Sequence, residues 1–240
     1  MVLIMPQKET PLIKRGQLKR NLSIVGAIHI DPKGEENLKA KLQELRPETI
    51  LLEMTEERAG WNRHFYEQLS QELSTEELRT IRPFLEYASQ VTGYELRAPN
   101  EYVLQNQETK LEFIDADTIS LDDFVRCMKI GIKASFLFYD LEKINPRELF
   151  QKLSNKSYSQ YEQGTLMGTD ELYQKLSSLR GSYVESQKRL NSPVRNDTMA
   201  SNIKRLYNPK ESLVAIVGLT HLKDLGRRLK DLNPQLIPLG

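Results

Sequence analysis

Cysteine is almost absent from this sequence, which has a single residue of that type, Cys127, among 240. One cysteine cannot form an internal disulfide, so a disulfide framework is excluded and a reducing, cytoplasmic location is expected. Long apolar runs are also missing, because no stretch approaches the roughly 20 residues that a membrane-spanning helix needs. The apolar start, Met1–Met5, lacks the basic region and long apolar middle of a signal peptide. We therefore expect neither a transmembrane segment nor a secretion signal.

An excess of charge of either sign is missing too. The chain has 34 Lys and Arg against 33 Asp and Glu, a net charge of +1. Nucleic-acid-binding proteins usually carry a strong basic excess or stripe, so the composition does not favour a nucleic-acid partner. The sequence also has no Gly-x-x-x-x-Gly-Lys-Ser/Thr loop, no Gly-x-Gly-x-x-Gly and no Gly-x-Ser-x-Gly elbow. ATP-driven, dinucleotide-dependent and serine-esterase functions therefore lack support.

Histidine is scarce as well, but two of the three histidines occupy the same place in a repeated pattern. Leu22–His29 and Leu213–His221 each consist of an apolar run that ends in Gly-x-x-His. The runs predict buried strands, and a segment with helical periodicity follows each of them. We expect the two strands to be neighbours, with both histidines facing one cleft at the carboxyl ends. A lone histidine would more often be a packing or capping residue, but the repeated context favours function.

Strands and helices alternate along the chain. Further predicted strands are Thr49–Glu53, Leu111–Asp115 and an edge strand at Gln235–Leu239, with segments of helical periodicity between them. The strand–helix–strand order of the first part predicts a βαβ unit with parallel pairing. We therefore predict an α/β fold with a mixed, partly parallel central sheet flanked by helices. A single domain of residues 1–240 is expected.

A looser and more polar helical pattern covers residues 134–191, where Gly164 and Gly168 interrupt it. We interpret this segment as a helical insertion between the two halves of the sheet. Its expected roles are a lid over the cleft or a contact surface for a homo-oligomer. Apolar helix faces account for Trp61 and Cys127 as core residues and for His64 as a packing or surface residue.

The strand at Thr49–Glu53 ends in an acid. A carboxylate that closes an apolar run must be solvated at the rim or paired with a cation, because burial of an unpaired charge is costly. Ligands tend to bind outside the carboxyl ends of strands in open α/β sheets. Glu53 and His29 each close a strand, so we expect them to face the same crevice.

Five ordered segments carry a resemblance to the TraB/PrgY/GumN/Tiki family: Gly26–His29, Leu51–Arg58, Gly93–Ala98, Arg195–Ala200 and Gly218–His221. They are similar to the two Gly-x-x-His motifs of the family, its strand ending in Glu, its Gly-x-Glu-Met segment and its Arg-Asn-x-x-Met-Ala segment. The resemblance implies a fold related to the erythromycin-esterase and haem-binding ChaN-like proteins. One departure is Asp115-Ala-Asp117, where related sequences have an Asp-Arg pair.

The resemblance also implies a divalent-metal site at His29, Glu53 and His221. Two imidazoles and one carboxylate suit Mn²⁺, Co²⁺, Fe²⁺ or Zn²⁺ and leave positions open for water. The expected function is a divalent-metal-dependent hydrolase, a peptidase acting on a peptide or another amide. The sequence leaves open whether Glu53 is a ligand or the base, and it leaves the metal open. The alternative is a non-catalytic protein that sequesters a peptide, or a haem-like ligand through one histidine.

Three other residues are candidates for substrate contact or catalysis. Arg195 could bind a substrate carboxylate or an oxyanion, and its alternative is a surface ion pair. Asn196 could donate to a tetrahedral intermediate or cap a helix. Glu95 could be a further acid in the substrate cleft, or a residue that interacts with a helix dipole. Asp115 and Asp117 are interpreted as turn residues.

Overall fold

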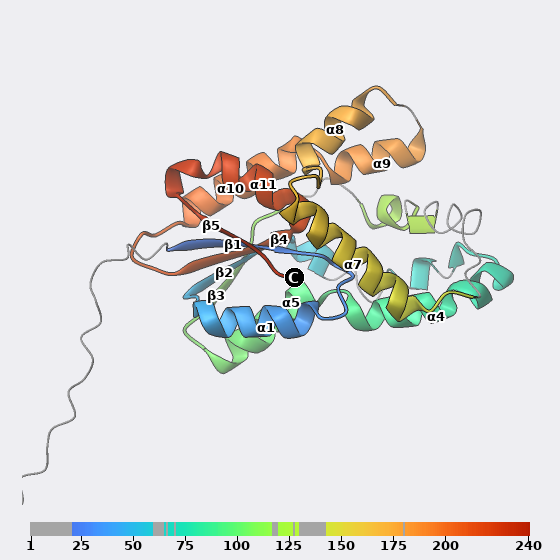
Figure 1. Cartoon of the computed structure of the whole chain (residues 1–240), viewed down its shortest axis with the longest axis horizontal. Coiled ribbons are helices and arrows are strands. Elements are labelled where there is room, and N and C mark those ends of the chain that lie inside the picture. Colours follow the sequence, from blue (N-terminus) through green and yellow to red (C-terminus); the bar gives the residue numbers. More distant parts are fainter. Residues whose placement is uncertain are drawn as a thin grey trace, which may run out of the picture.

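The computed structural model describes residues 21–59, 65, 67–69, 71–116, 120–126, 128–129, 143–179 and 181–240. Within these ranges the chain forms a five-stranded sheet with helices on both faces (Figure 1). The predicted α/β fold is confirmed, and every pairing between the described strands is parallel. Several residues considered from the sequence lie outside the described ranges, namely Trp61, His64, Asp117 and Cys127.

The sheet has the strand order β3-β2-β4-β1-β5. The strands are β1 (Leu22–Ala27), β2 (Thr49–Leu52), β3 (Lys110–Phe113), β4 (Leu213–Gly218) and β5 (Gln235–Pro238). Central strands β1 and β4 are buried along all six residues, as expected of parallel strands that helices cover on both faces. The last strand, β5, lies at an edge as predicted, where Pro238 is tolerated although it has no N–H.

One predicted pairing is wrong, because β1 and β2 are not neighbours. Strand β4 lies between them and pairs with both, in register Ala27↔Gly218 on one side and Leu52↔Ile216 on the other. The six residues of β4 are apolar or glycine, so a position between two strands and two helical layers buries the most apolar surface. This insertion of β4 brings the two Gly-x-x-His motifs to adjacent strands.

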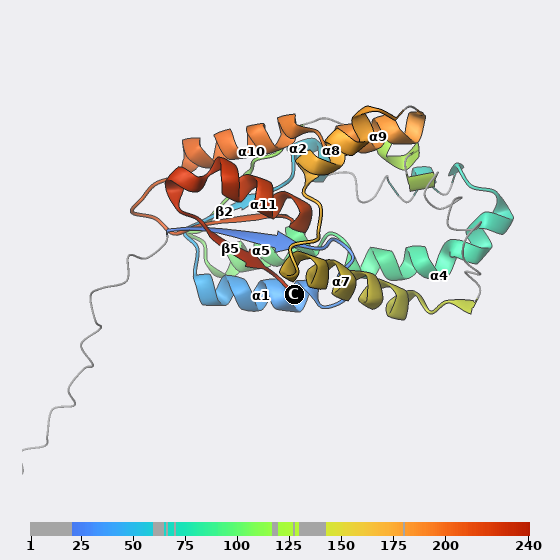
Figure 2. The ribbon, with the colours of Figure 1, turned by 45° about the horizontal axis from the view of Figure 1, so that its top comes forward.

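Two pairs of helices cover the two faces of the sheet, as Figures 1 and 2 show. Helices α1 (Gly34–Leu45) and α5 (Tyr94–Gln105) lie on one face, and α10 (Pro193–Leu206) and α11 (Leu219–Arg228) on the other. The remaining described helices are α2 (Glu56–Ala59), α4 (Thr75–Val91), α7 (Pro146–Glu162), α8 (Thr169–Ser177), α9 (Ser182–Leu190) and the 3₁₀ turn η2 (Lys230–Leu232).

The helix boundaries test the capping patterns in the sequence. A capping box of Ser74 and Glu77 begins α4, and the helix continues through Pro83. Gly93, with a φ of 72°, separates α4 from α5 in the left-handed region that suits glycine. Helix α10 begins earlier than predicted, because Ser192 caps it and a proline occupies its first position. Asn196 therefore does not cap this helix, although its sequence position had suggested that role.

The described part of the predicted insertion contains α7, α8 and α9, which lie between β3 and β4 in the chain. These helices gather toward the carboxyl ends of the strands (Figure 2). Helix α8 contacts both α10 and α11. The insertion is thus in position to contribute side chains to the edge of the sheet where both histidine motifs end.

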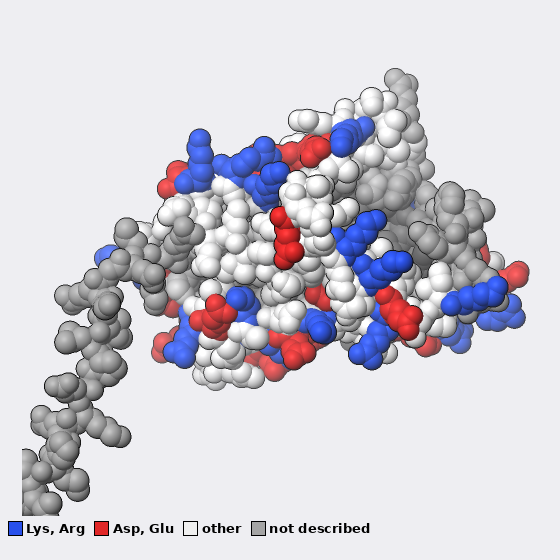
Figure 3. Space-filling model, in the orientation of Figure 1, with Lys and Arg blue, Asp and Glu red and all other residues white. Residues whose placement is uncertain are grey.

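The charged side chains of the displayed surface are mixed in sign, since Lys and Arg alternate with Asp and Glu over the face in Figure 3. Among the described residues, no helix is both long enough and apolar enough to cross a membrane.

Candidate functional site

The parallel pairing of β1 with β4 places the two Gly-x-x-His motifs side by side. In the pairing register Gly26 lies opposite Val217, one position before Gly218. A Cβ atom on Gly26 would lie 2.8 Å from Leu222 Cδ2 and 2.9 Å from a Leu219 methyl carbon. Gly26 is therefore required by the close packing of α11 on β1. Gly218, in contrast, lies beside the side chains of the candidate site.

The side chains of His29, Glu53 and His221 meet around Gly218. A Cβ atom on Gly218 would lie 3.4 Å from Glu53 Oε2, 3.4 Å from His29 Nε2 and 3.5 Å from His221 Cδ2. These three residues follow β1, follow β2 and lie in the first turn of α11, respectively. The three residues predicted as metal ligands thus surround one small space, which we call the Gly218 site.

Glu53 is the most firmly held group of this site, and its side chain is only 6% exposed. Oε2 accepts a hydrogen bond from the Gly218 N–H at 2.5 Å, and Oε1 accepts one from Arg195 Nη2 at 2.6 Å. Burial opposes ionisation, but the charges of His221 and Arg195 hold the pKa of Glu53 well below its usual range. Glu53 is therefore an anion at neutral pH and a weak base.

Arg195 is buried behind Glu53 and binds a second carboxylate. Its Nε donates to Asp115 Oδ1 at 3.0 Å, and its Nη1 donates to the Leu190 carbonyl. The guanidinium group of Arg58 also contacts Asp115, so two cations face the two carboxylates Glu53 and Asp115. Arg195 is 4% exposed and already has these partners, so it holds Glu53 in place instead of facing a substrate.

A second guanidinium group, that of Arg58, also contacts the Asp115 carboxylate. It lies in α2, at the end of the same Leu51–Arg58 segment that resembles the family. Asp115, interpreted from the sequence as a turn residue, is fully buried between Arg58 and Arg195.

His221 is buried, and polar groups fix its ring. Its Nδ1 lies 2.7 Å from Asn196 Oδ1, and its Nε2 lies 3.2 Å from Glu53 Oε1. The amide nitrogen of Asn196 donates to Thr169 and Asp170 on α8, so the amide oxygen is the atom that faces the ring. Asn196 is fully buried, and its position behind His221 gives it no access to a substrate.

His29 is the accessible histidine, with a side chain that is 64% exposed. Its Nδ1 lies 2.7 Å from Oε1 of Glu95, in the first turn of α5. The preceding carbonyl, of Ile28, accepts a hydrogen bond from the buried Tyr94 hydroxyl at 3.0 Å. Glu95, considered from the sequence as a substrate contact, thus orients a histidine ring.

We predict that Glu95→Gln lowers the pKa of His29. The Glu95 carboxylate raises the pKa of the His29 imidazole from 6.5 to about 9 against a smaller, opposing effect of burial, and a neutral amide removes the charge. The pair therefore stabilises the fold fully below pH 6.5 and loses this effect as the pH rises through about 9. Solvent screening at an exposed ring keeps that contribution small. Titration of the His29 ring by NMR in metal-free protein measures the shift.

The control for this titration is Glu101→Gln, which removes an exposed carboxylate of α5 that pairs with Lys39 and does not touch His29. The parent pKa should persist in that variant. An unchanged His29 pKa in Glu95→Gln would contradict the assigned pair.

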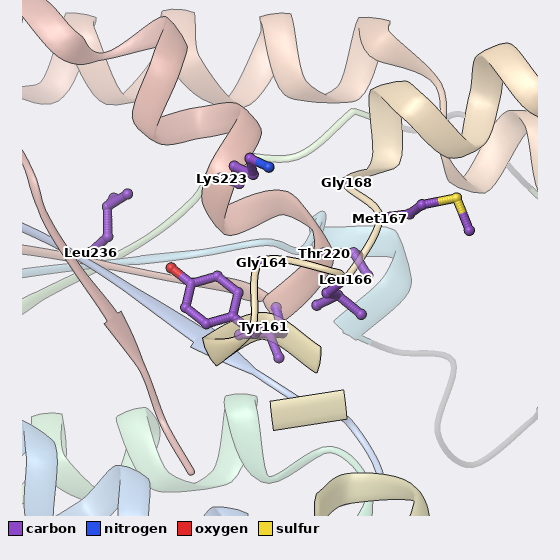
Figure 4. Close-up of a pocket in the computed structure, with 9 residues that line it drawn as sticks. Tyr161, Gly164, Leu166, Met167, Gly168, Thr220, Lys223 and Leu236 are labelled. Carbon is purple, nitrogen blue, oxygen red and sulfur yellow. The ribbon is translucent and has the colours of Figure 1, made fainter. Parts of the chain in front are cut away.

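A small cavity lies beside the Gly218 site, with a volume of about 240 Å³ (Figure 4). It is lined by Tyr161, Gly164, Leu166, Met167, Gly168, Leu219, Thr220, Lys223 and Leu236. Leu219 and Thr220 join Gly218 to His221, so the cavity wall is continuous in the chain with the site. Figure 4 shows the Tyr161 ring between Leu236 on β5 and Thr220 on α11. Its size suits one side chain, because pockets for whole ligands usually have about 300–1,000 Å³.

The side-chain groups of the Gly218 site are of the chemical types that bind divalent cations. Both histidines bind an oxygen acceptor through Nδ1, the arrangement that usually supports metal-ligating imidazoles and leaves Nε2 as the ligand. His221 Nε2 also lies 3.2 Å from Glu53 Oε1, so a cation at this point would meet a nitrogen and an oxygen ligand together. Among the described residues, however, no three His, Cys, Asp or Glu side chains already converge as a metal-binding group. Binding of a metal ion therefore requires the two rings to move closer to Glu53.

No family model matches the chain, and a search of curated proteins gave no match either. The geometry of the site is therefore the basis on which a function can be assigned. Thr169 and Asp224, which also belong to the site, were not found from the sequence. Asp224 lies one helical turn after His221, which was a weak signal, and Thr169 gave no signal.

Proposed function

We propose that this protein is a divalent-metal-dependent hydrolase of the TraB/PrgY/GumN/Tiki type that acts on peptides or related amides. The observation that carries the proposal is the pair of histidines, each held through Nδ1 by an oxygen acceptor and each adjoining Glu53 and Gly218. His29 and His221 would hold the ion through Nε2, with Glu53 as the carboxylate ligand. Such an ion polarises a carbonyl and lowers the pKa of water. The single cysteine supports a cytoplasmic location.

Other groups of the site would support the proposed metal ligands. Arg195 and the Gly218 N–H keep Glu53 ionised and fix its direction. The low pKa of Glu53 favours a ligand role over that of general base, because an effective base has a pKa near the working pH. The exposed face of His29 is the side from which a substrate can approach.

The test is the metal content of purified protein after dialysis against Mn²⁺, Co²⁺ or Zn²⁺. Near-stoichiometric metal is expected in the parent and in His64→Gln, which alters the one histidine that is not a proposed ligand. Loss of the metal is expected in folded His29→Gln and His221→Gln, because each removes one of three ligands. Parent protein that binds none of these ions would overturn the proposal. Release of new amino termini from a peptide pool, dependent on the bound ion, then tests hydrolysis.

A second candidate function is binding of a peptide without cleavage. The full engagement of Glu53 by Arg195 and Gly218 favours it, since this carboxylate already has donors and needs no metal to remain ionised. Stoichiometric peptide binding in metal-free protein, with no cleavage after metal is added, would select this function. The same measurement on His29→Gln tests whether the exposed ring contacts the peptide.

The cavity beside the site is lined mainly by apolar groups, with Lys223 as its one charged lining residue, and it predicts a preference for substrates with an apolar side chain. A charge placed on its wall, by Leu236→Glu, should raise KM for apolar substrates about tenfold, because mismatched pocket contacts typically cost about 10- to 200-fold. Gln235→Glu adds the same charge at the neighbouring exposed position of β5 and should leave KM unchanged. Equal values of KM in the two variants would assign the substrate side chain to another surface.

A further inference from the structure

The first two residues of α8 control the amide group behind His221. Asn196 Nδ2 donates to Thr169 Oγ1 at 2.7 Å and to Asp170 Oδ1 at 2.8 Å. An amide nitrogen has two N–H groups, and both are used by these acceptors. The amide oxygen must then point the other way, where His221 Nδ1 lies 2.7 Å from it. A carbonyl oxygen cannot donate, so Nδ1 of His221 carries a proton, and its contact is closer than the 3.2 Å between Nε2 and Glu53 Oε1.

Asp224 fixes the hydroxyl of Thr169 in turn. Its Oδ2 accepts from Thr169 Oγ1 at 3.1 Å and from the Asp170 N–H at 3.1 Å, so the carboxylate caps the start of α8 from α11. The hydroxyl proton of Thr169 is thereby directed to Asp224, which leaves its oxygen to accept from Asn196. Thr169 and Asp224 are 1% and 2% exposed, so no water competes freely for these bonds.

The contact between α8 and α11 is tight at this point. A Cβ atom on Gly168, just before α8, would lie 2.6 Å from Asp224 Oδ2 and 2.9 Å from Oδ1. Arg228 further fastens the helix by an ion pair of 2.6 Å with Asp170 Oδ2. The start of α8 therefore has little freedom to move away from Asp224 while the helices remain docked.

We propose that Thr169, Asp170 and Asp224 are positioning residues that fix the proton of His221 on Nδ1 and free Nε2 for a ligand. The helical insertion is then part of the site, because it supplies both acceptors that orient Asn196. The tautomer assignment stands on the hydrogen-bond network alone, and only the identity of the Nε2 ligand as a metal ion rests on the proposed function. Loss of α8 docking would release the amide and mix the two tautomers of His221.

The experiment compares the ring nitrogens of His221 by long-range ¹H–¹⁵N NMR in metal-free protein, with the histidine signals assigned through His→Gln variants. At a pH at which the His221 ring is neutral, the parent and Thr169→Ser, which keeps the hydroxyl, should show the Nδ1–H tautomer. The double variant Thr169→Val/Asp170→Ala removes both acceptors and should show averaged ¹⁵N shifts of a tautomer mixture. Its Co²⁺ affinity, measured by visible absorption, should fall about 10- to 100-fold, the usual effect of losing such supporting groups.

Arg228→Met is the matched control, since it weakens the docking of α8 without removing an acceptor of Asn196. It should keep the parent tautomer. If the double variant does not fold, each single variant is measured instead, and a partial shift toward the mixture is expected. An Nε2–H tautomer in the parent, or unchanged ¹⁵N shifts in the folded variants, would overturn the proposal. Parent protein with the Nδ1–H tautomer that binds no metal would leave this inference standing and reject the metal site.

Discussion

Substitution of Arg195 by methionine is expected to lower the free energy of unfolding by about 3–5 kcal/mol, the usual cost of breaking a buried ion pair. The variant leaves Glu53 without its cation at a side chain that is 6% exposed. The side chain of Asp115, which is fully buried, retains Arg58 as its one cationic partner, beside the Ala116 N–H. Methionine fills part of the volume, so the loss reflects uncompensated charge more than a cavity.

Urea unfolding at pH 7 measures this change in the free energy of unfolding. The control is Arg189→Met, which removes an exposed ion pair with Asp123 and should cost less than about 1 kcal/mol. A difference between the parent and Arg195→Met that is no larger than the control value would show that Glu53 and Asp115 are solvated. In that case Arg195 would be available for the substrate contact that the sequence suggested.

Substitution of Gly218 by valine should remove the ligand-binding capacity of the site. The backbone at Gly218, with φ of −60° and ψ of 141°, is open to any residue, so the effect comes from side-chain volume. A Cβ atom already touches Glu53, His29 and His221 at 3.4–3.5 Å, and the two methyl groups of valine extend among them. We expect Co²⁺ affinity and peptide hydrolysis to fall about 100-fold or more, because small displacements of reacting groups have effects of that size.

Gly218→Ala is the matched control, because its methyl group makes ordinary contacts without separating the three side chains. Its Co²⁺ affinity should lie much closer to that of the parent. Circular dichroism and urea unfolding establish that Gly218→Val is folded, since overpacking by itself typically costs about 1–3 kcal/mol. Parent-like Co²⁺ affinity in folded Gly218→Val would place the ligand away from Gly218.

The site residues that could be predicted from the sequence are those that stand in a recognisable local pattern. Each of His29, Glu53 and His221 ends an apolar run or follows it closely, and the ends of parallel strands lie at the same edge of a sheet. The position of β4 between β1 and β2 had no such signal. Many strand orders satisfy the same alternation of helices and strands, and total burial decides among them.

The supporting groups of the site were harder to predict for a related reason. Thr169 acts through contacts with α10 and α11 that exist only after three helices dock. Asn196 was interpreted as a cap or a donor to substrate, because a helix start and a polar side chain are visible in the sequence and a buried partner is not. Arg58 belongs to a segment that resembles the family, but its contact with Asp115 depends on the positions of β2 and β3.

The location of β4 also determines when during synthesis the protein can become functional. Glu53 and Gly218 are 165 positions apart in the chain, and β1 has no direct partner in the first half of the sequence. A growing polypeptide cannot assemble the centre of the sheet until the segment that contains β4 has left the ribosome. Closing so long a chain delays these contacts, which is typical of slow folders. Before that moment β1 and β2 lack the strand that pairs with both of them, and unpaired apolar edges of this kind favour aggregation.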